Sequence, residues 1–173
     1  METALELFAN DGYYTTSVAK IARRAKISKG LMYHYFDSKE GLISAILDQG
    51  MEAMMTNIDQ DKDGVLTQEE LDTLIRSIFT QVKGNISYWK LYFALILQPA
   101  VHQIVTMRHK RAVDEPSKLL TEYFQKKGTL DSKIEATVFH CLIDGISINY
   151  AIDPDNFPLE DCIDYLIRKY VNS

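Results

Sequence analysis

Apolar residues recur every three to four positions along nearly the whole of this 173-residue chain, which is the spacing of one face of an α-helix. No stretch alternates convincingly between apolar and polar residues, as a half-buried strand does, and we find no internal repeat and no low-complexity segment. Hydrophobic residues make up 46% and charged residues 25% of the chain, which is an ordinary globular balance. The sequence therefore predicts an all-α fold with a buried core.

The cysteines and the N-terminal residues argue against several classes of protein. Cys141 and Cys162 lie far apart, without CxxC spacing or a nearby His cluster, so we expect buried free thiols and neither a disulfide framework nor a zinc site. The N-terminus lacks the pattern of a signal peptide, and the longest apolar run is too short to span a membrane. We find no nucleophile with a partnered base, no metal triad and no phosphate-cradling glycine loop. The sequence thus predicts a cytoplasmic protein that has no membrane partner and is not an enzyme.

Positive charge is concentrated in one short segment of an acidic protein. Residues 13–36 contain five basic residues and no acidic one, whereas the rest of the chain holds 14 basic and 24 acidic residues, so that the net charge is −5. Such a segment is typical of a surface for a polyanion, because neutralising phosphates releases counterions and supplies most of the nonspecific affinity for nucleic acid. The alternative is a charged helix face that is merely solvated.

Three short helices are predicted near the N-terminus, at residues 2–10, 16–25 and 29–36. The first ends where Gly12 can take the left-handed cap conformation, and Thr16 or Ser17 can cap the second. Ser28 is placed to cap the third helix. The side chains that we expect to point inward from this third helix are Leu31, Tyr35 and Phe36. Two short helices joined by a tight turn, with basic and hydroxyl residues outside, are the parts of a helix-turn-helix.

The run of residues 12–42 resembles the DNA-binding segment of the TetR family of transcriptional regulators. The matching motifs are Gly12-Tyr13, Thr15-Thr16, Ile21-Ala22, Ser28-Lys29-Gly30, Tyr33 to Phe36, and Ser38-Lys39-Glu40. So many positions at fixed spacing make a far more specific signal than one short motif. The resemblance implies a three-helix helix-turn-helix head at residues 1–46, followed by a helical ligand-binding and dimerisation domain at residues 47–173.

Carried onto this sequence, the family pattern places the third helix in the major groove of DNA, with its N-terminal end nearest the bases. Gly30 would let the backbone come close, Leu31 could touch a thymine methyl group, and Tyr33 and His34 would meet phosphates. The candidate DNA-binding residues are Thr16, Ser28, Lys29, Gly30, Leu31, Tyr33, His34 and Lys39. Each side chain has a plainer alternative, as a helix cap, a core residue or a solvated group.

The sequence departs from the family pattern at two places. Lys26 stands in the turn where family members often have glycine, so a left-handed backbone there would carry strain. The numbering also starts inside the first helix, where the family usually has several more residues, so a phosphate-contacting N-terminal arm is not represented in this sequence.

The last third of the chain is predicted to form a homodimer. A single helix-turn-helix reads only a few base pairs, so specificity needs two copies spaced along the duplex. Residues 131–151 and 158–171 predict two amphipathic helices, and the second has a proline in its first turn. In the TetR family the last two helices pair with those of a second copy as a four-helix bundle. The alternative is that both helices pack only within their own subunit.

The middle of the chain is a candidate ligand-binding region. Residues 87–107 begin with a nearly continuous apolar run that Pro99 interrupts, which predicts a central helix with a kink or break before the proline. In TetR relatives this region encloses a pocket for a small-molecule inducer. The candidate lining residues are Tyr88, Trp89, Tyr92, Phe93, His102, Met107, Phe139 and His140. Plain core packing is the commoner explanation for aromatic residues at this spacing, and the sequence does not name a ligand.

Residues 59–70, DQDKDGVLTQEE, space oxygen-bearing side chains as the calcium loop of an EF-hand does. The candidate Ca²⁺ ligands are Asp59, Asp61, Asp63, the carbonyl of Val65, Thr67 and Glu70, with Gly64 at the sharp turn. Four carboxylates held so close repel one another unless a cation binds. The alternative is a capping box in which Thr67 and Glu70 begin a helix, and this box competes for Glu70. No second loop of this kind is found, although EF-hands generally occur in pairs.

These patterns favour a homodimeric TetR-like regulator, most often a repressor in this family. It would bind an operator in double-stranded DNA and be released by an unidentified small molecule. Calcium would modulate it by fixing the angle between the helix of residues 38–58 and the next helix, which would bias the separation of the two recognition helices in the dimer. The rival hypothesis is an EF-hand-type calcium sensor or buffer whose basic head does not bind DNA specifically.

Overall fold

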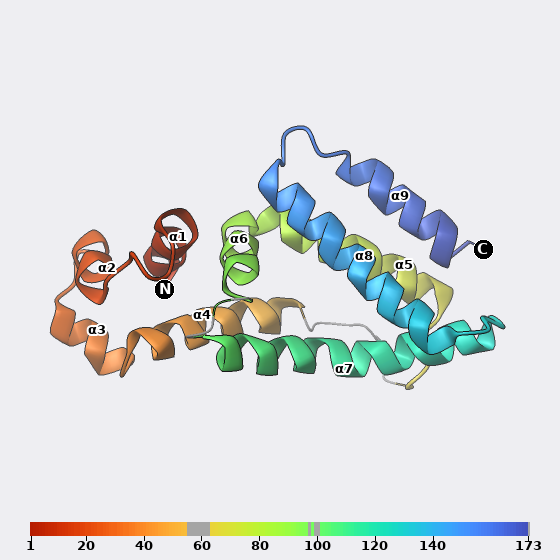
Figure 1. The fold of residues 1–173 in the computed structure, drawn as a ribbon, viewed down its shortest axis with the longest axis horizontal. Coiled ribbons are helices and arrows are strands. Elements are labelled where there is room, and N and C mark those ends of the chain that lie inside the picture. Colours follow the sequence, from red (N-terminus) through yellow and green to blue (C-terminus); the bar gives the residue numbers. More distant parts are fainter. Residues whose placement is uncertain (55–62, 97, 99–100, 173) are drawn as a thin grey trace. The chain divides into compact units, whose positions relative to one another are not determined.

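The computed structural model describes residues 1–54, 63–96, 98 and 101–172, and every regular element among them is an α-helix (Figure 1). The helices are α1 (Glu2–Asp11), α2 (Val18–Arg24), α3 (Lys29–Tyr35), α4 (Lys39–Met54), α5 (Gln68–Gly84), α6 (Ile86–Leu95), α7 (His102–Lys126), α8 (Ser132–Ile152) and α9 (Leu159–Tyr170). The predicted all-α fold, with its three N-terminal helices, is confirmed.

The chain folds as two compact units, each made of two stretches of sequence. Unit 1 comprises Met1–Ala53 and Asn85–Arg108, and unit 2 comprises Met54–Gly84 and His109–Ser173. Unit 1 therefore holds α1 to α3, nearly all of α4, α6 and the start of α7, and unit 2 holds α5, the rest of α7, α8 and α9. Residues 1–46 lie wholly in unit 1. The functional division between residues 1–46 and 47–173 stays a prediction.

Unit 1 joins the head to helices from further along the chain. Helix α1 packs against α6, although about seventy-five residues of sequence separate them. The largest fully buried apolar side chains, each at most 1% exposed, are Phe8, Leu42, Ile43, Leu47, Leu91 and Leu95. Burying one such side chain contributes roughly 1.5–3 kcal/mol relative to leaving it in water. Three of the six belong to α4, so one face of α4 is held firmly inside unit 1.

The predicted helix caps form, and the structure decides between the two residues that the sequence offers for α2. The Ser17 hydroxyl accepts a hydrogen bond from the Lys20 N–H at 3.1 Å, and the Ser28 hydroxyl accepts one from the Leu31 N–H at 3.0 Å. Ser17 and not Thr16 is therefore the cap of α2. Each cap satisfies an amide that the first turn of a helix leaves without a partner.

The turn between α2 and α3 has a left-handed residue at Lys26, the position where the resemblance to the TetR family indicates glycine. Lys26 has a φ of 57°, and it is the one non-glycine residue with positive φ in the part of the chain that the structure describes. The Ile27 N–H donates to the Ala22 carbonyl at 3.0 Å, and the Lys26 N–H donates to the Arg23 carbonyl at 3.2 Å. This is the pattern that usually ends a helix with glycine. A side chain in this conformation costs roughly 1–2 kcal/mol.

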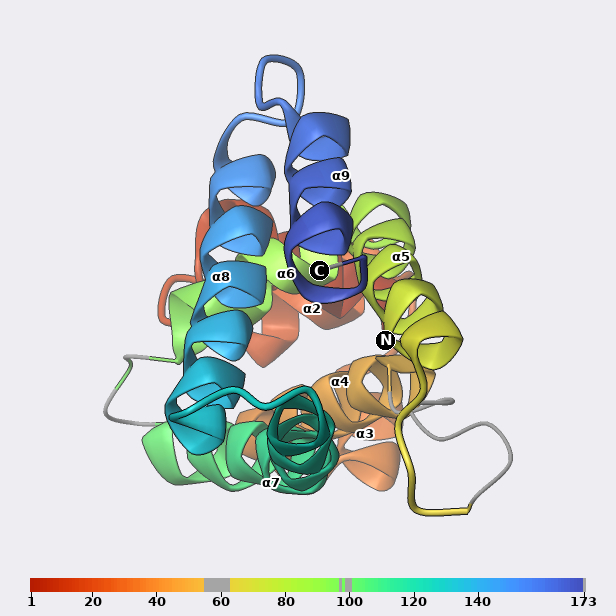
Figure 2. The same cartoon turned by 90° about the vertical axis from the view of Figure 1, so that its right-hand side faces the viewer.

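Unit 2 is a helical cluster in which α5, α8 and α9 contact one another (Figure 2). Its buried apolar core includes Leu71, Ile75, Phe79, Phe124, Phe139, Ile163 and Leu166. The C-terminal end of α9 is tied down by hydrogen bonds to main-chain carbonyls. Gln68 donates to the Val171 carbonyl at 2.7 Å, and Tyr123 donates to the Tyr170 carbonyl at 3.1 Å. These bonds join the first turn of α5 and the end of α7 to the last helix.

The apolar run in the middle of the chain does not continue as one helix. Helix α6 ends at Leu95 and α7 begins at His102, so the helix stops before Pro99, as predicted. Residues 97, 99 and 100 lie outside the described residues. Within the described part of the chain, no helix combines the length and the apolar character needed to cross a membrane.

The prediction of buried free thiols is wrong. Both cysteines are free, but Cys141 is exposed and Cys162 is only partly buried. Cys141 is exposed because of its position on α8. Its neighbours Phe139 and Ile143 face the core of unit 2, and the helical twist turns Cys141 away from them.

Candidate nucleic-acid interface

Helix α3 is held by one buried side chain and presents the others outward. Met32 is 4% exposed, whereas Leu31 and Tyr33 are each 43% exposed, and Lys29, Gly30 and His34 are also exposed. The expectation that Leu31 and Tyr35 point inward is wrong, because Tyr35 is 71% exposed and Met32 takes the inward position. The seven residues of α3 make only two turns, which are too few for periodicity alone to fix the facing direction. The outward face therefore carries five of the candidate DNA-binding residues.

Basic side chains accompany this outward face. Arg23, Arg24, Lys26 and Lys29 are all exposed, and the Lys29 ammonium lies 5.7 Å from the centre of the Tyr33 ring. Lys20, which the sequence grouped with them, forms an ion pair with Asp11 at 2.9 Å. Exposed cations beside a short exposed helix make a surface suited to phosphates.

Two candidate DNA-binding residues, Thr16 and Lys39, have hydrogen-bond partners within the head. Thr16 has no exposed surface and donates a hydrogen bond to the Leu7 carbonyl at 3.1 Å. The Lys39 ammonium donates to the Tyr13 carbonyl and lies 4.1 Å from the centre of the Tyr13 ring. Burial lowers the pKa of Lys39, against the opposing effect of Glu40. The placement of these side chains gives no support to a phosphate contact by Thr16 and assigns Lys39 an internal role.

Tyr13 and Glu40 complete this link between the head and α4. The Tyr13 hydroxyl donates to the Glu40 carboxylate at 2.8 Å. Burial raises the pKa of Tyr13, and the hydrogen bond and negative charge of Glu40 raise it further, so Tyr13 is a neutral donor. The turn after α1 is thus fixed to the first turn of α4. The Ser-Lys-Glu motif marks this position in the sequence, but the partner, 26 and 27 residues earlier, becomes visible only in the fold.

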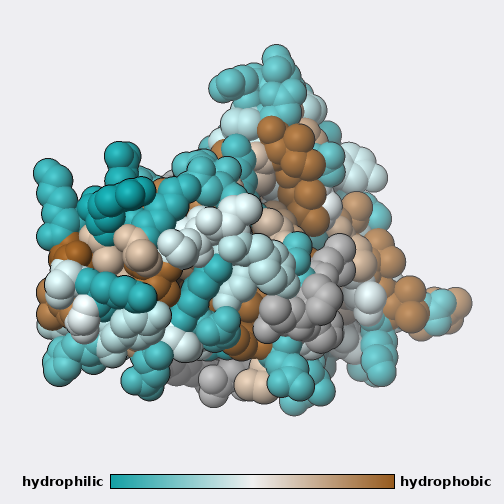
Figure 3. Space-filling model, turned by 60° about the vertical axis from the view of Figure 1, so that its left-hand side comes forward, coloured by the Kyte–Doolittle hydropathy of each residue, from teal (hydrophilic) through white to brown (hydrophobic). Residues whose placement is uncertain are grey.

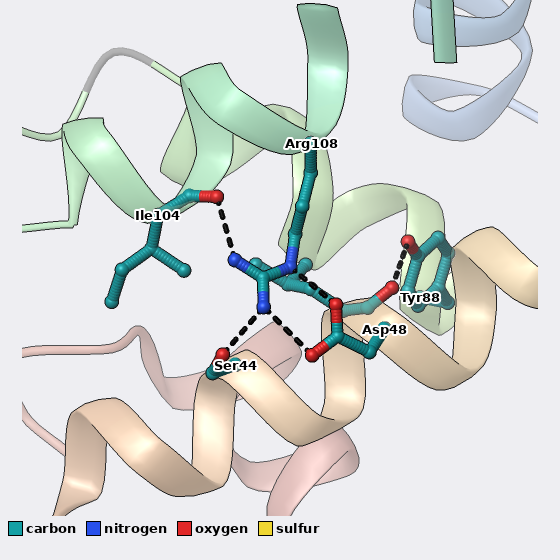
Figure 4. A network of polar contacts seen from close by, with 6 residues as sticks. Ser44, Asp48, Tyr88, Ile104 and Arg108 are labelled. Atoms are coloured by element: carbon teal, nitrogen blue, oxygen red, sulfur yellow. Dashed lines mark hydrogen bonds and ion pairs between the residues drawn. The ribbon is translucent and has the colours of Figure 1, made fainter. Parts of the chain in front are cut away.

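A second link to α4 was missed by sequence reasoning (Figure 4). The Arg108 guanidinium donates to both oxygens of Asp48, at 2.8 and 2.7 Å, and to the Ser44 hydroxyl at 2.5 Å. It also donates to the Ile104 carbonyl in its own helix at 2.8 Å. Nearby, the Tyr88 hydroxyl donates to the Leu47 carbonyl at 3.2 Å. No local sequence pattern predicts these contacts, because Arg108 follows Asp48 by 60 residues.

The candidate pocket residues divide between the two units. Tyr88, Trp89 and Tyr92 are between 4% and 6% exposed in unit 1, where their rings and that of Phe93 contact one another. Phe139 is buried in unit 2, where Nε2 of His140 lies 3.4 Å from the Asp144 carboxylate. Met107 is 69% exposed, and the side chain of His102 lies outside the described residues. The pocket itself stays a prediction.

The acidic loop is described only in its second half. Asp59 and Asp61 lie outside the described residues, while Gly64 has a φ of 77° and the Asp63 carboxylate accepts from the Val65 N–H at 2.7 Å. No group of three potential metal-ligating side chains is found among the residues that are described.

Thr67 and Glu70 form the capping box that the sequence offers as the alternative to calcium binding. Glu70 accepts hydrogen bonds from the Thr67 N–H at 2.9 Å and from the Thr67 hydroxyl at 2.8 Å, and its own N–H donates to that hydroxyl at 3.2 Å. The box begins α5 and occupies a Glu70 oxygen that a cation would need.

A capped, exposed two-turn helix that follows a second short helix across a tight turn, with cations beside it, is the arrangement of a helix-turn-helix, the class of head found in many DNA-binding proteins. Comparison with known proteins narrows this class. Residues 1–46 match the family described as bacterial regulatory proteins, tetR family. Over these residues the chain is therefore similar to the TetR family of regulatory proteins.

Curated relatives show further sequence similarity, and a solved structure shares the fold. The uncharacterised HTH-type transcriptional regulator YuxN of Bacillus subtilis is 50% identical over 58 residues, which cover 34% of this chain and 20% of that protein. The regulator BetI of Pseudomonas paraeruginosa is 25% identical over 178 residues, 96% of this chain and 88% of that protein. The chain spans less than half the length of YuxN and of two further curated relatives. The regulator FadR of Bacillus subtilis, solved with stearoyl-CoA, shares the fold with a TM-score of 0.76 at 22% identity, covering 98% of this chain and 95% of that one.

Proposed function

We propose that this protein is a homodimeric transcriptional repressor that binds an operator through α3 and leaves it when a small molecule binds to the helical body. The observation that carries the proposal is the outward face of α3, where Lys29, Leu31 and Tyr33 are free of the core while Met32 anchors the helix. A helix held by its inner face and open along its outer face can enter a major groove without unfolding the head.

Within this proposal, the N-terminal end of α3 reads base edges and its C-terminal end meets the backbone. Lys29 can donate to guanine, Gly30 lets the helix approach closely, and Leu31 can contact a thymine methyl group. Tyr33 and His34 would donate to phosphates, together with the exposed arginines of α2. Ser28 would act mainly as a cap, since its hydroxyl already accepts from the Leu31 N–H.

The proposed inducer is a molecule with a long acyl chain, such as a fatty acyl-CoA. Support comes from the structural neighbour that was solved with stearoyl-CoA. An apolar chain also suits the aromatic cluster of Trp89, Tyr92 and Phe93, which a ligand could enter by rearranging rings that contact one another. Binding would lower operator affinity if it favoured a different position of α4, the helix that continues from the head.

Selection of bound duplexes from random DNA tests this function directly. We expect one enriched two-fold symmetric sequence, with affinity for it well above that for scrambled DNA at moderate salt. Stearoyl-CoA should weaken this binding, whereas free coenzyme A serves as the matched control without an acyl chain. No enrichment over scrambled duplex would overturn the DNA-binding function. Enrichment without an effect of stearoyl-CoA would overturn only the proposed inducer.

Calcium modulation is the part of the proposal that depends on the acidic loop, and the variant Glu70→Gln tests it. Gln keeps the hydrogen bonds of a capping box, so without calcium its stability should stay within about 0.5 kcal/mol of the parent. If the loop binds Ca²⁺, the parent gains about 2.7 kcal/mol at a concentration one hundred times the Kd, and Glu70→Gln loses this gain. Thermal denaturation with CaCl₂ or with chelator measures both.

The control for Glu70→Gln is Asp72→Asn, which removes one negative charge from α5 outside the loop. Asp72 is paired with Arg76 at 2.9 Å and takes no part in the capping box. Asp72→Asn should keep the calcium-dependent gain. An equal response of the two variants, or no response of the parent protein, would remove calcium from the mechanism and leave the capping box as the role of Glu70. Weak, sequence-independent DNA binding alongside tight calcium binding would instead favour a calcium sensor.

A further inference from the structure

The turn that ends α2 has the same hydrogen bonds as the turn that ends α7. After α7, the Thr129 N–H donates to the Phe124 carbonyl at 3.0 Å, and the Gly128 N–H donates to the Gln125 carbonyl at 3.0 Å. The two N–H groups at the corresponding positions after α2 make the same pair of bonds. The residue of positive φ is Gly128 in the first turn, with a φ of 79°, and Lys26 in the second, with a φ of 57°. The chain thus builds one turn twice, with glycine in one copy and lysine in the other.

Lysine is the strained choice at position 26. In the left-handed conformation a Cβ atom lies too close to the next carbonyl oxygen, whereas glycine has no such atom. Every other positive φ among the described residues belongs to glycine, at Gly12, Gly64 and Gly128. Lys26 is exposed, and its ammonium makes no hydrogen bond or ion pair with any residue that the structure describes. Contacts inside the described chain therefore do not offset the strain, and a strained residue of this kind is a candidate for function.

Lys26 also belongs to a group of cations that the chain leaves without acidic partners. Arg23 and Arg24 are exposed and form no ion pair within the described residues. Residues 13–36 contain no acidic residue that could neutralise them. Figure 3, turned so that the side of α2 and α3 comes forward, shows hydrophilic side chains over much of that side. Like charges so close in sequence repel one another, and a polyanion relieves that repulsion.

The turn has a fixed position next to the N-terminal end of α3. The bonds that close α2 hold Lys26 from one side, and two residues later the Ser28 hydroxyl accepts from the Leu31 N–H at 3.0 Å. In the proposed function, the N-terminal end of α3 lies nearest the base edges. The residues that lead into this end must pass the rim of the groove, which is lined by phosphates. A rigid turn there can hold a cation against the DNA backbone.

We propose that Lys26 contacts a backbone phosphate of DNA from the turn between α2 and α3, and that this contact offsets the strain of its left-handed backbone. The proposal rests on the proposed function, since it adds one residue to the surface that binds the operator. A phosphate contact carries no information about the bases, so Lys26 supports binding to every sequence equally. Lys29, at the first turn of α3, differs from it because a contact with a base edge discriminates between sequences.

The variant Lys26→Gly tests the contact by its dependence on salt. We expect its affinity for the selected operator and for scrambled duplex to fall by the same factor, about fivefold or more at 0.1 M salt. The slope of log K against log salt concentration should flatten by about 0.9 for each bound copy. Lys29→Ala should instead lower the ratio of operator affinity to scrambled affinity. Fluorescence anisotropy at several KCl concentrations measures the slope and the ratio.

The same variant is expected to gain stability while it loses affinity. Lys26→Gly removes the strain, so its midpoint of thermal unfolding should rise by about 2–4 °C without DNA. The reciprocal variant Gly128→Lys should lower the midpoint by a similar amount. A Cβ atom at position 128 would meet nothing within 4 Å, so the backbone conformation alone accounts for this loss. Gly128→Lys lies outside the head and should keep the salt slope of the parent.

Two further variants separate a contact by Lys26 from an effect of net charge. Lys90→Gln removes one charge from an exposed position on α6, in the same unit as the head, and should leave the salt slope unchanged. Lys26→Arg keeps both the charge and the Cβ atom. It should rescue the slope that Lys26→Gly loses, while its thermal midpoint stays at that of the parent.

The outcomes distinguish this inference from the proposed function. A parent protein that prefers no sequence over scrambled duplex overturns the function and the inference together. If the parent binds its operator and Lys26→Gly keeps the full salt slope, the inference alone is overturned. An equal loss of slope in Lys90→Gln overturns it as well, because net charge would then explain the affinity. A thermal midpoint of Lys26→Gly at or below that of the parent would show that Lys26 is not strained and would remove the proposed offset.

Discussion

The variant Gly50→Ala is expected to lower the free energy of unfolding by about 2–3 kcal/mol, although alanine is the better helix former. A Cβ atom at position 50 would lie 2.0 Å from Cε2 and 2.2 Å from Cζ of Tyr88. The Tyr88 ring is 5% exposed, and its hydroxyl donates to the Leu47 carbonyl at 3.2 Å. The ring therefore has no free space to enter, and α4 or α6 must shift. Urea denaturation followed by circular dichroism measures the loss.

Gly84→Ala is the matched control for Gly50→Ala. Gly84 is the last residue of α5, and a Cβ atom there would meet nothing within 4 Å. We expect no loss of stability and a gain of at most about 1 kcal/mol. Replacing Tyr88 by leucine in the Gly50→Ala background should restore part of the loss, whereas Tyr88→Phe should not, since the clash involves the ring. Similar effects of Gly50→Ala and Gly84→Ala would show that the contact between α4 and α6 is looser than described.

The variant Arg108→Ala is expected to cost about 2 kcal/mol, because hydrogen bonds to charged groups contribute roughly 1.5–3 kcal/mol and Asp48 can partly regain solvation. The Arg108 side chain is 16% exposed and that of Asp48 is 54% exposed, so this pair is only partly screened by water. The same guanidinium also donates to Ser44, as Figure 4 shows. Amide hydrogen exchange should rise in α4, because Arg108 holds that helix to the start of α7.

Two variants define what Arg108 does beyond carrying a charge. Arg108→Lys keeps the charge but cannot donate two parallel hydrogen bonds, so we expect it to lose at least half as much stability as Arg108→Ala. Arg76→Ala removes an exposed arginine that is paired with Asp72 one turn away, and it should change stability by less than about 0.5 kcal/mol. Equal losses of stability in Arg76→Ala and Arg108→Ala would show that the Arg108 contact contributes no more than an ordinary surface ion pair.

Both contacts concern α4, whose first turn is also bound to Tyr13 of the head. A ligand that displaced Tyr88 or Arg108 would free the later turns of α4 while the first turn stayed fixed to the head. The proposed release from DNA can therefore be tested with the variants at Gly50 and Arg108. If a change in α4 causes release, these variants should also change operator affinity in the folded protein.

Much of the head could be predicted because its signals are local. Ser28 caps the helix that begins at the next residue, and Lys26 adopts the left-handed turn that its position in the motif requires. The all-α fold and the helix near 131–151 follow in the same way from spacing along the chain. Five candidate DNA-binding residues lie on the outward face of α3, where Met32 and not Leu31 or Tyr35 is the buried residue, and their contact with DNA stays a prediction.

Other predictions failed or stayed open because they depend on which residues of other helices pack against a side chain. Thr16 was expected among the DNA contacts, but the helix opposite supplies a carbonyl for its hydroxyl and buries it. Cys141 was expected to be buried, since cysteine often is, yet it lies on the open side of α8. For the acidic loop, the capping box at Thr67 and Glu70 is described, while calcium binding still awaits its test.

The sequence by itself determined where the three N-terminal helices begin and end and that they have the form of a helix-turn-helix head, because caps, turn residues and apolar spacing act within a few residues. Only the tertiary structure decided that the Tyr88 ring packs directly against Gly50, that Arg108 donates hydrogen bonds to Asp48, and that one side of α8 is exposed. The physical reason is that burial and hydrogen bonding depend on partners brought together by folding, and the distance between such partners along the chain carries no local signal.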